Sequence, residues 1–381
     1  MQRLAAVAIS ALLIATPALA EIKVGFVTSL SGPAAALGIP YSKGMAAAQR
    51  YKAKVGDETV TVIQLDDGSD PSTATRNARK LVEDDKVDIL IGTATAPGAI
   101  AMSTVATELN VPMIAISPIK VETADPAKQS TIAVPQPPML MAKVIADRMK
   151  RDKVKNVGYI GFSDAWGDLV YAGGKAAEER GEIKLLTNER YARTDTSVTA
   201  QILRILATKP DGVLIGGSST QAALPLLALA ERGFKGKSYG LASLINPDFV
   251  RVGGKAAEGV QVSAGPVIVS EQLPDGHFSK KLSAEFRKAY KEVNDAESRD
   301  GFSAYSFDAY LIFANAAERA LGKAKPGTPE FRKALRDAML NTKELAGVHG
   351  VYNFKPGQGY GVDERSLVIV QLKDGKWTYA P

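Results

Sequence analysis

The chain has 381 residues, which is too long for one ordinary hydrophobic core and predicts two domains. Its composition, with 45% hydrophobic and 23% charged residues, is globular and excludes a disordered or fibrous protein. The formal net charge of +6 comes from scattered lysines and arginines that form no basic stripe, so we expect no nucleic-acid partner.

The first twenty residues have the pattern of an export signal. Arg3 supplies a sparse positive start, the apolar stretch LAAVAISALLIA follows, and residues 16–20 end in the small-x-small pattern of a signal peptidase site. The apolar stretch is shorter than the ~20 residues that a bilayer-spanning helix needs, which favours cleavage after Ala20 over a membrane anchor. The chain has no cysteine, so neither disulfides nor a lipidated N-terminal cysteine are expected. We therefore predict a protein of the bacterial periplasm.

Short β-branched runs then recur along the chain and alternate with helical patterns. The runs are continuously apolar, which suits parallel strands that are buried on both faces. The predicted strands are 22–28, 60–66, 87–93, 111–117, 156–162, 183–189, 211–217, 237–243 and 259–264. One helix is expected to begin at Asp70-Pro71, where Asp70 can cap the helix and Pro71 suits its first position. The alternation predicts an α/β fold with doubly wound parallel sheets.

The segment 130–142 interrupts this alternation. Pro135, Pro137 and Pro138 cannot lie inside a helix or a central strand, so we place a crossover between two lobes there. Ligands of open α/β sheets bind beyond the carboxyl ends of the strands, and a ligand cleft is therefore expected between the lobes.

The sequence contains no recognisable catalytic or metal-binding constellation. Its two histidines, His277 and His349, have polar, loop-like neighbours and are interpreted as solvated surface residues. Without cysteine or paired histidines a metal site is not expected, and the adjacent Asp66 and Asp67 are interpreted as turn or capping residues. No nucleophile, base and orienting group come together, so we expect neither an enzyme nor a cofactor.

Several segments resemble one protein family, in the family's order. They are GFVTSLSGPAAALG (25–38), DDGSDPSTATRNARKLVEDDKVDILIG (66–92), VPMIAISP (111–118), GFSDAWGD (161–168), AAEGVQVS (256–263) and the aromatic stretch 305–310. The family is that of the periplasmic solute-binding proteins of branched-chain amino acid (leucine/isoleucine/valine) ABC importers. The resemblance covers essentially the whole mature chain. It implies the type I periplasmic binding protein fold, with two Rossmann-like lobes joined by three crossovers around a central cleft.

The resemblance also implies the course of the chain between the lobes. Residues 21–135 and 265–348 would form the N-terminal lobe, and residues 136–264 and 349–381 the C-terminal lobe. The third crossover would lie near 348–354, so that the strand at 368–372 returns to the second lobe. Lobe closure around a small ligand would then present it to the permease and ATPase subunits of an importer. We expect the receptor itself to be a monomer.

Family positions for the ligand carboxylate fall on two loops of the first lobe. The family serine after the IG strand is matched by Ala96, which leaves its backbone N–H and the Thr95 hydroxyl as donors. After the ISP strand, which holds Ser117, the family's Ala-Thr pair is matched by Lys120-Val121. Two orientations of Lys120 stay open, one toward an anionic ligand and one toward water.

The remaining family positions surround the body of the ligand. The aromatic residue of the family's first loop is Leu37 here, and the tyrosine of its second-lobe turn is Trp166. Phe302 or Tyr305 would supply a second aromatic face. Ser218 and Ser219 follow the strand 211–217 and suit either the site or a turn. The family acid that pairs with the ligand ammonium falls near Ala242, where this chain has no carboxylate.

The missing acid points to a ligand without an ammonium group. Burying an unpaired ammonium costs several kcal/mol, whereas micromolar binding totals only about −8 kcal/mol. We therefore expect a small carboxylate with an aromatic or hydrophobic body, such as a benzoate derivative. Asp164 or Asp248 could replace the acid, although turn or capping roles explain both more simply. A branched-chain or other hydrophobic amino acid as ligand, and a sensory rather than a transport role, remain the alternatives.

Overall fold

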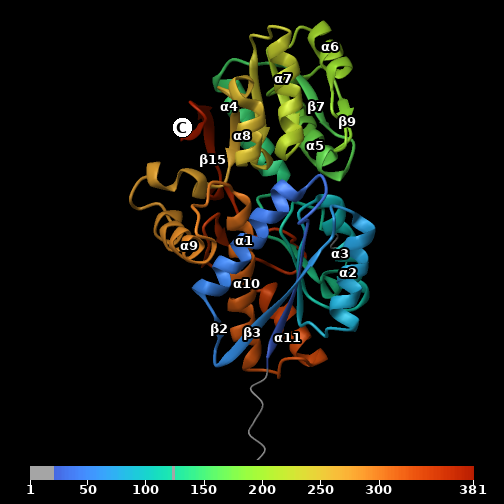
Figure 1. The fold of residues 1–381 in the computed structure, drawn as a ribbon, viewed down its shortest axis with the longest axis vertical. Helices are drawn as coiled ribbons and strands as arrows, with labels where there is room; N and C mark the ends of the chain where they lie inside the picture. The colour runs from blue at the N-terminus through green and yellow to red at the C-terminus, as the bar shows by residue number, and fades with distance from the viewer. Residues whose placement is uncertain (1–20, 122–124) are drawn as a thin grey trace, which may run out of the picture.

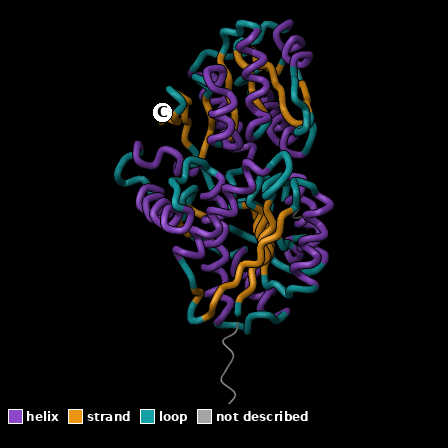
Figure 2. The backbone as a smooth tube through the Cα atoms, viewed as in Figure 1, coloured by secondary structure: helices purple, strands orange, loops and turns teal. Residues whose placement is uncertain are grey.

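The computed structural model describes residues 21–121 and 125–381 and folds them into two lobes, shown one above the other in Figure 1. The predicted export signal, residues 1–20, lies outside this range. Each lobe has a β-sheet covered by helices (Figure 2), which confirms the expected α/β fold of two Rossmann-like lobes. None of the helices within the described ranges is long and apolar enough to cross a membrane.

The first sheet has six strands in the order β2-β3-β1-β4-β5-β6. These are β1 (Ile22–Thr28), β2 (Lys54–Val55), β3 (Glu58–Asp66), β4 (Ile89–Gly92), β5 (Met113–Ala115) and β6 (Thr131–Ala133). The central strand β1 pairs in parallel with β3 and β4, and Val24 faces both Val62 and Ile89. Because helices cover both of its faces, β1 is almost wholly buried, as its continuous apolar run predicts.

Six of the helices within residues 21–121 and 125–381 belong to the first lobe. They are α1 (Ala35–Tyr51), α2 (Pro71–Glu83), α3 (Ala96–Glu108), α9 (Ser279–Asn294), α10 (Phe302–Leu321) and α11 (Pro329–Met339). The helix at Asp70-Pro71 is confirmed as α2, where the Asp70 side chain accepts a 2.7 Å hydrogen bond from the backbone N–H of Thr73. Helix α10 lies against α1 (Figure 1), and a side chain at Gly44 would place its Cβ 1.9 Å from the carbonyl oxygen of Ser303. Glycine at this position therefore permits the close approach of the two helices.

The second sheet has eight strands, of which seven lie in the order β16-β15-β12-β11-β10-β7-β8 while β9 also pairs with β7. They are β7 (Asn156–Phe162), β8 (Lys184–Leu185), β9 (Glu189–Tyr191), β10 (Gly212–Gly216), β11 (Lys237–Leu241), β12 (Gln261–Ala264), β15 (Val368–Lys373) and β16 (Lys376–Tyr379). The predicted strand 183–189 is thus two short strands, because residues 186–188 leave the ladder. The C-terminal strand β15 returns to this sheet as expected. It pairs antiparallel with β12, so the sheet is mixed rather than purely parallel.

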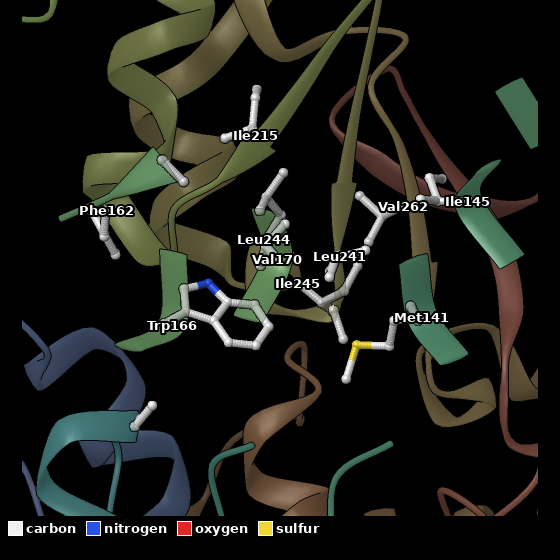
Figure 3. Packing of buried hydrophobic residues seen from close by; sticks show 14 of the residues in the cluster. Met141, Ile145, Phe162, Trp166, Val170, Ile215, Leu241, Leu244, Ile245 and Val262 are labelled. Carbon is white, nitrogen blue, oxygen red and sulfur yellow. The ribbon is translucent and has the colours of Figure 1, made fainter. Parts of the chain in front are cut away.

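In the described part of the chain, five helices cover the second sheet. They are α4 (Pro138–Arg151), α5 (Ala165–Glu179), α6 (Thr199–Ala207), α7 (Ala223–Glu231) and α8 (Pro247–Gly253). Their apolar faces and the sheet form a hydrophobic cluster that includes Phe162, Ile215 and Val262 (Figure 3). This cluster is the rigid support for the cleft face of the lobe.

The chain passes between the lobes at three places. The first passage follows β6 and includes Pro135 and Pro137, after which Pro138 occupies the first position of α4. The second follows β12 through the 3-10 segment Pro266–Gln272. The third lies between the hairpin β13 (Leu345–Ala346) and β14 (Val351–Tyr352) and strand β15.

The third passage lies later in the chain than the expected range 348–354. Val348, Tyr352 and Phe354 are buried in the hydrophobic cluster of the first lobe. Further along, the N–H of Ala133 in β6 still donates to the carbonyl oxygen of Gly359 at 2.8 Å. The hairpin is held there by Asp308 of α10, whose side-chain oxygens accept hydrogen bonds from the backbone N–H groups of residues 348 and 349. Because of this long-range contact, the chain returns to the second lobe at a later residue than expected.

Candidate ligand-binding site

A cleft lies between the lobes at the carboxyl ends of the parallel strands of both sheets. It holds about 470 Å³ of unoccupied space, part of it open to solvent. Nine of the residues predicted from the sequence line it, namely Leu37, Thr95, Ala96, Ser117, Trp166, Ser218, Ala242, Phe302 and Tyr305. The lining also contains seven residues that were not predicted as ligand contacts, namely Tyr41, Ala94, Pro118, Pro135, Met141, Arg193 and Ser243.

Lys120 and Val121 do not line the cleft, and of the two orientations left open for Lys120 the structure has the exposed one. The Tyr360 hydroxyl donates to the carbonyl oxygen of Ile119 at 2.6 Å and accepts from the N–H of Ile119 at 3.1 Å. Val121 packs against Gly359, where an added Cβ would lie 2.4 Å from the Val121 side chain. The chain after Pro118 is thereby drawn toward the third passage, and Lys120 is exposed.

Of the two roles left open for Ser219, the structure shows the turn. Its backbone has φ 56°, in the left-handed region, and its buried side chain is not part of the cleft lining. The turn after β10 therefore presents only Ser218 to the cleft.

Thr95 ends the loop that follows β4 and caps helix α3, and Ala96 is the first residue of that helix. The Thr95 hydroxyl oxygen accepts from the N–H of Gly98 at 3.2 Å, so its own proton stays available to a ligand. The backbone N–H of Ala96 belongs to the first turn of a 13-residue helix, where N–H groups have no intrahelical acceptor. This corner of the cleft offers hydrogen-bond donors to an anion.

Arg193 lines the same cleft from the second lobe and lies two residues after β9. Its Nε donates to the Asp164 carboxylate at 2.6 Å and its Nη1 donates to the Ser218 hydroxyl at 3.2 Å. The guanidinium also lies 4.2 Å from the centre of the Phe162 ring. Asp164, Ser218 and Phe162 thus hold the guanidinium at the cleft wall.

Arg193 is the one charged side chain among the described residues that line the cleft. The residue was missed because the expected strand ended at residue 189, whereas β9 continues to Tyr191 and places the following loop at the sheet edge. Arg193 could have been predicted from its place shortly after a strand, because ligands of open α/β sheets bind beyond the carboxyl ends of the strands. Within the described ranges no cluster of acids or histidines could hold a metal ion.

The two acids considered as replacements for the missing family acid have other partners. Asp164 caps α5, accepting from the N–H groups of Trp166 and Gly167, and its second oxygen pairs with Arg193. Asp248 pairs with Arg251 on the surface and does not line the cleft. Ala242, near which the resemblance puts the family's acid, does line the cleft.

Aromatic and apolar side chains form the rest of the wall. The indole N–H of Trp166 donates to the carbonyl oxygen of Gly217 at 3.2 Å, which fixes the ring. Figure 3 shows Trp166 and Met141 at the edge of the second-lobe cluster, on the side that faces the first lobe. Phe302 meets the Tyr41 ring edge-on at 5.6 Å between centroids. The cleft therefore combines one cationic corner with a largely apolar interior.

His349 lies behind Tyr305 and is buried, so its interpretation as a surface residue was wrong. The two rings stack with centroids 3.8 Å apart, and the His349 Nε2 lies 2.8 Å from the carbonyl oxygen of Gly301. Burial lowers the pKa of His349 to about 4, which keeps the ring neutral at ordinary pH. His349 consequently adds no charge behind the cleft.

Known proteins support the family assignment. The sequence model of the periplasmic binding protein family matches residues 21–376. A Leu/Ile/Val-binding protein of Rhizobium johnstonii is 24% identical over 99% of this chain and 98% of its own length.

Solved structures agree with this match. An extracellular ligand-binding receptor of Rhodopseudomonas palustris HaA2 is 41% identical with a TM-score of 0.90, covering 95% of this chain and 100% of the receptor. An ABC transporter solute-binding protein from R. palustris, solved in complex with benzoate, has the same fold at 22% identity and a TM-score of 0.80, covering 94% of this chain and 95% of that protein. This chain therefore belongs to the periplasmic binding protein family, as a type I member related to the Leu/Ile/Val-binding proteins.

Proposed function

We propose that this protein is the periplasmic substrate-binding component of an ABC importer for a small organic acid with an aromatic or hydrophobic body, such as a benzoate derivative. The observation that carries the proposal is the charge of the cleft: among the described lining residues Arg193 is the one charged side chain, and Ala242, near which the resemblance puts an acid, lines the cleft without a carboxylate. A carboxylate finds a cation there, whereas an ammonium group finds no counter-ion.

The carboxylate binds at the corner formed by both lobes. Arg193 supplies a charge-assisted donor, and the Ser218 hydroxyl, which accepts from Arg193, can direct its own proton to the ligand. Thr95 and the N–H of Ala96 supply donors from the opposite lobe. A ligand held by both sets stabilises the closed arrangement, because neither lobe alone provides all the donors.

The apolar body of the ligand lies against Trp166, Phe302 and Leu37. Aromatic rings offer each other stacked or edge-on contacts, and a flat ligand ring suits the fixed indole face. A solute-binding protein of the same fold was solved in complex with benzoate, which supports an aromatic acid as the ligand.

Transport implies partners outside this chain. The closed receptor presents its surface to the permease, and the ATPase subunits drive release. We propose an exported, monomeric receptor without catalytic activity or cofactor, whose signal is cleaved after Ala20. A sensory ligand-binding role uses the same cleft and differs only in the partner protein.

The alternative ligand is a branched-chain or other hydrophobic amino acid, as the names of the curated relatives suggest. We expect benzoate or 4-hydroxybenzoate to raise the melting temperature of the purified protein and leucine to leave it unchanged. Phenylalanine and 3-phenylpropionate form a matched pair, since they differ only by the ammonium group. Stabilisation by leucine or phenylalanine without any response to the acids would contradict the proposal.

A second prediction concerns the contacts that join the closed lobes. The side chain of Asn246 caps α8 by accepting from the N–H of Asp248 at 2.8 Å, and its amide Nδ2 donates across the cleft to the carbonyl oxygen of Ala36 at 2.5 Å. We expect Asn246→Asp to keep the cap but to place an oxygen against the Ala36 carbonyl. Ligand affinity should fall about tenfold because one inter-lobe hydrogen bond of the closed form is lost.

Asn246→Ser is the matched control for the cap, because serine caps helices well but is too short to cross to Ala36. Both variants should unfold near the wild-type temperature without ligand and bind more weakly by titration calorimetry. Wild-type affinity in both would show that Asn246 serves α8 alone.

A further inference from the structure

We infer that this protein has a second ligand site, a cationic groove between the lobes that binds a polyvalent oxyanion through phosphoryl or carboxylate groups and thereby bridges the two lobes. The groove lies at the second passage of the chain, where Ile268 contributes to its lining. It holds about 1350 Å³ of unoccupied space, part of it open to solvent. None of its described lining residues also lines the ligand cleft. The inference does not depend on which solute the cleft binds.

The charged walls of the groove come from both lobes. The first lobe supplies Arg287 of α9 and Arg299 in the loop before α10. The second lobe supplies Arg251 of α8 and Lys376 at the start of β16. Figure 1 shows α9 on the same side of the molecule as the C-terminus, which follows β16. The described lining holds one acid, Glu297, so its cations outnumber its acids four to one.

Two of these cations have no counter-ion in the protein. Arg299 and Lys376 are exposed and form no ion pair with any residue of the described ranges. The acid of the groove does not compensate them, because Glu297 forms a 2.7 Å ion pair with Lys291, which lies outside the lining. An oxyanion therefore meets one unpaired cation from each lobe and displaces no carboxylate to reach them.

The other two cations can join such an anion. Arg251 pairs with Asp248 at 2.9 Å, but 69% of its side chain is exposed, and exposed pairs contribute little to stability. Arg287 is more firmly held, since its Nη2 donates to the carbonyl oxygen of Val267 at 2.7 Å and its Nη1 contacts Glu271. A guanidinium has five N–H groups, so Arg287 retains donors while these contacts fix its position at the second passage.

The segments that carry the unpaired cations are anchored in different lobes. Lys376 follows a turn in which the N–H of Gly375 donates to the Glu258 carboxylate of the second lobe at 2.8 Å. Arg299 lies two residues before Gly301, whose N–H donates across the lobes to the carbonyl oxygen of Ile245 at 3.3 Å. The relative position of Arg299 and Lys376 therefore depends on how the lobes are arranged.

Binding in the groove should favour the same lobe arrangement as binding in the cleft. Cations of the two lobes repel each other when the groove is empty, and an anion between them replaces this repulsion with attraction. The arrangement that it stabilises also contains the contact of Asn246 with Ala36 across the cleft. By linkage, each ligand should then raise the affinity of the other by the same factor.

Titration calorimetry with pyrophosphate at constant ionic strength tests the site directly. We expect the wild type to bind pyrophosphate and Arg299→Gln/Lys376→Gln to bind it about tenfold or more weakly, because charge-assisted hydrogen bonds are lost. Lys155→Gln/Lys323→Gln is the matched control, since it removes one exposed cation from each lobe outside the groove. The control should bind pyrophosphate like the wild type. Absence of binding by the wild type, or an equal loss in the control, would overturn the inference.

The variant Arg193→Met separates the groove from the cleft. Its affinity for pyrophosphate should equal that of the wild type, because Arg193 lines the cleft and not the groove. Loss of pyrophosphate binding in a folded Arg193→Met variant would place the anion in the cleft and overturn the inference. Thermal unfolding without ligand verifies the fold of every variant.

The coupling between the sites is measured with a cleft solute in the presence and absence of saturating pyrophosphate. We expect pyrophosphate to raise the affinity for benzoate about fivefold or more in the wild type and to leave it unchanged in Arg299→Gln/Lys376→Gln. If leucine rather than benzoate binds in the cleft, the proposed function fails, and the same measurement with leucine still tests the groove. Pyrophosphate binding that leaves the affinity of the cleft solute unchanged would contradict the bridging of the lobes.

A parallel measurement identifies the source of the oxyanion. Cosedimentation of the wild type with phosphatidylglycerol vesicles, lost in Arg299→Gln/Lys376→Gln, would assign the phosphoryl groups to a membrane surface. Binding of pyrophosphate without cosedimentation would assign them to a soluble anion. Cosedimentation that the variant retains, together with unchanged pyrophosphate binding, would show that the groove reads neither and overturn the inference.

Discussion

Replacing Arg193 with methionine is expected to weaken the binding of an acid ligand such as 4-hydroxybenzoate about 100-fold. Hydrogen bonds to a charged group contribute about 1.5–3 kcal/mol each, and 2.8 kcal/mol corresponds to a factor of 100. Among the described lining residues no other cation is available to take the place of the guanidinium. Methionine keeps much of the length and the contact with the Phe162 ring, so the loss reports the charge.

The substitution also removes the partner of Asp164. The two side chains form an ion pair at 2.6 Å with 17% and 19% of their surfaces exposed. Asp164 keeps its bonds to the N–H groups at the start of α5, which limits the destabilisation. The double variant Arg193→Met/Asp164→Asn leaves no unpaired acid at this place. We expect it to recover the stability lost by the single variant and to remain unable to bind the acid tightly.

Titration calorimetry with 4-hydroxybenzoate and benzoate measures this prediction, and thermal unfolding without ligand verifies the fold. Lys120→Met is the matched control, since Lys120 is exposed and lies outside the cleft lining. It should bind the acids like the wild type. Wild-type affinity in a folded Arg193→Met variant, or a large loss in Lys120→Met, would show that the anion binds elsewhere.

The contrast between Lys120 and Arg193 shows what the sequence could predict of the site. Residues at the ends of clearly patterned strands, such as Thr95 after β4 and Ser218 after β10, line the cleft. Lys120 failed because Tyr360, 241 positions from Ile119, draws its loop away. No local pattern encodes such a contact. Arg193 was missed because β9 has only three residues and carries a weak pattern.

The fold was more predictable than the site, for a physical reason. Burial on both faces makes each parallel strand a continuous apolar run, and the cap at Asp70 is a local interaction. The third passage between the lobes was misplaced because the hairpin β13–β14 depends on Asp308, some forty positions earlier in the chain. The sequence therefore predicted the elements that local burial and local hydrogen bonds determine. It did not predict the position of the third passage, which depends on a contact with a distant residue.

That anchor gives the second prediction with a large effect, a pH dependence of stability that Asp308→Asn removes. Asp308 is fully buried, and its carboxyl group accepts from the N–H of Val348 at 2.8 Å, the N–H of His349 at 2.9 Å and the Tyr352 hydroxyl at 2.8 Å. Burial raises the pKa of Asp308 from 3.8 to about 7, although these three donors act to lower it.

The sign of the effect follows from proton binding. Between about pH 4 and pH 7 the unfolded chain loses the Asp308 proton while the folded protein keeps it, so this group lowers the free energy of unfolding as pH rises. One pH unit corresponds to 1.36 kcal/mol, and the difference between wild type and Asp308→Asn should therefore widen by about 3 kcal/mol on acidification from pH 7 to pH 4.5. In addition, the amide nitrogen of asparagine is a donor and would face one of the donors that now bind Asp308. This lost hydrogen bond should lower the free energy of unfolding of the variant by about 1–3 kcal/mol at every pH.

Chemical denaturation at several pH values measures both parts of this prediction. His349 titrates in the opposite sense, because its pKa is lowered to about 4 and acidification then favours the unfolded chain. Its contribution is common to wild type and variant and cancels in the difference. Tyr352→Phe is the matched control: it removes a donor that lowers the pKa of Asp308, so the dependence should persist with its midpoint at higher pH. A constant difference between wild type and Asp308→Asn would mean that the folded protein holds Asp308 ionised, with the three donors outweighing burial.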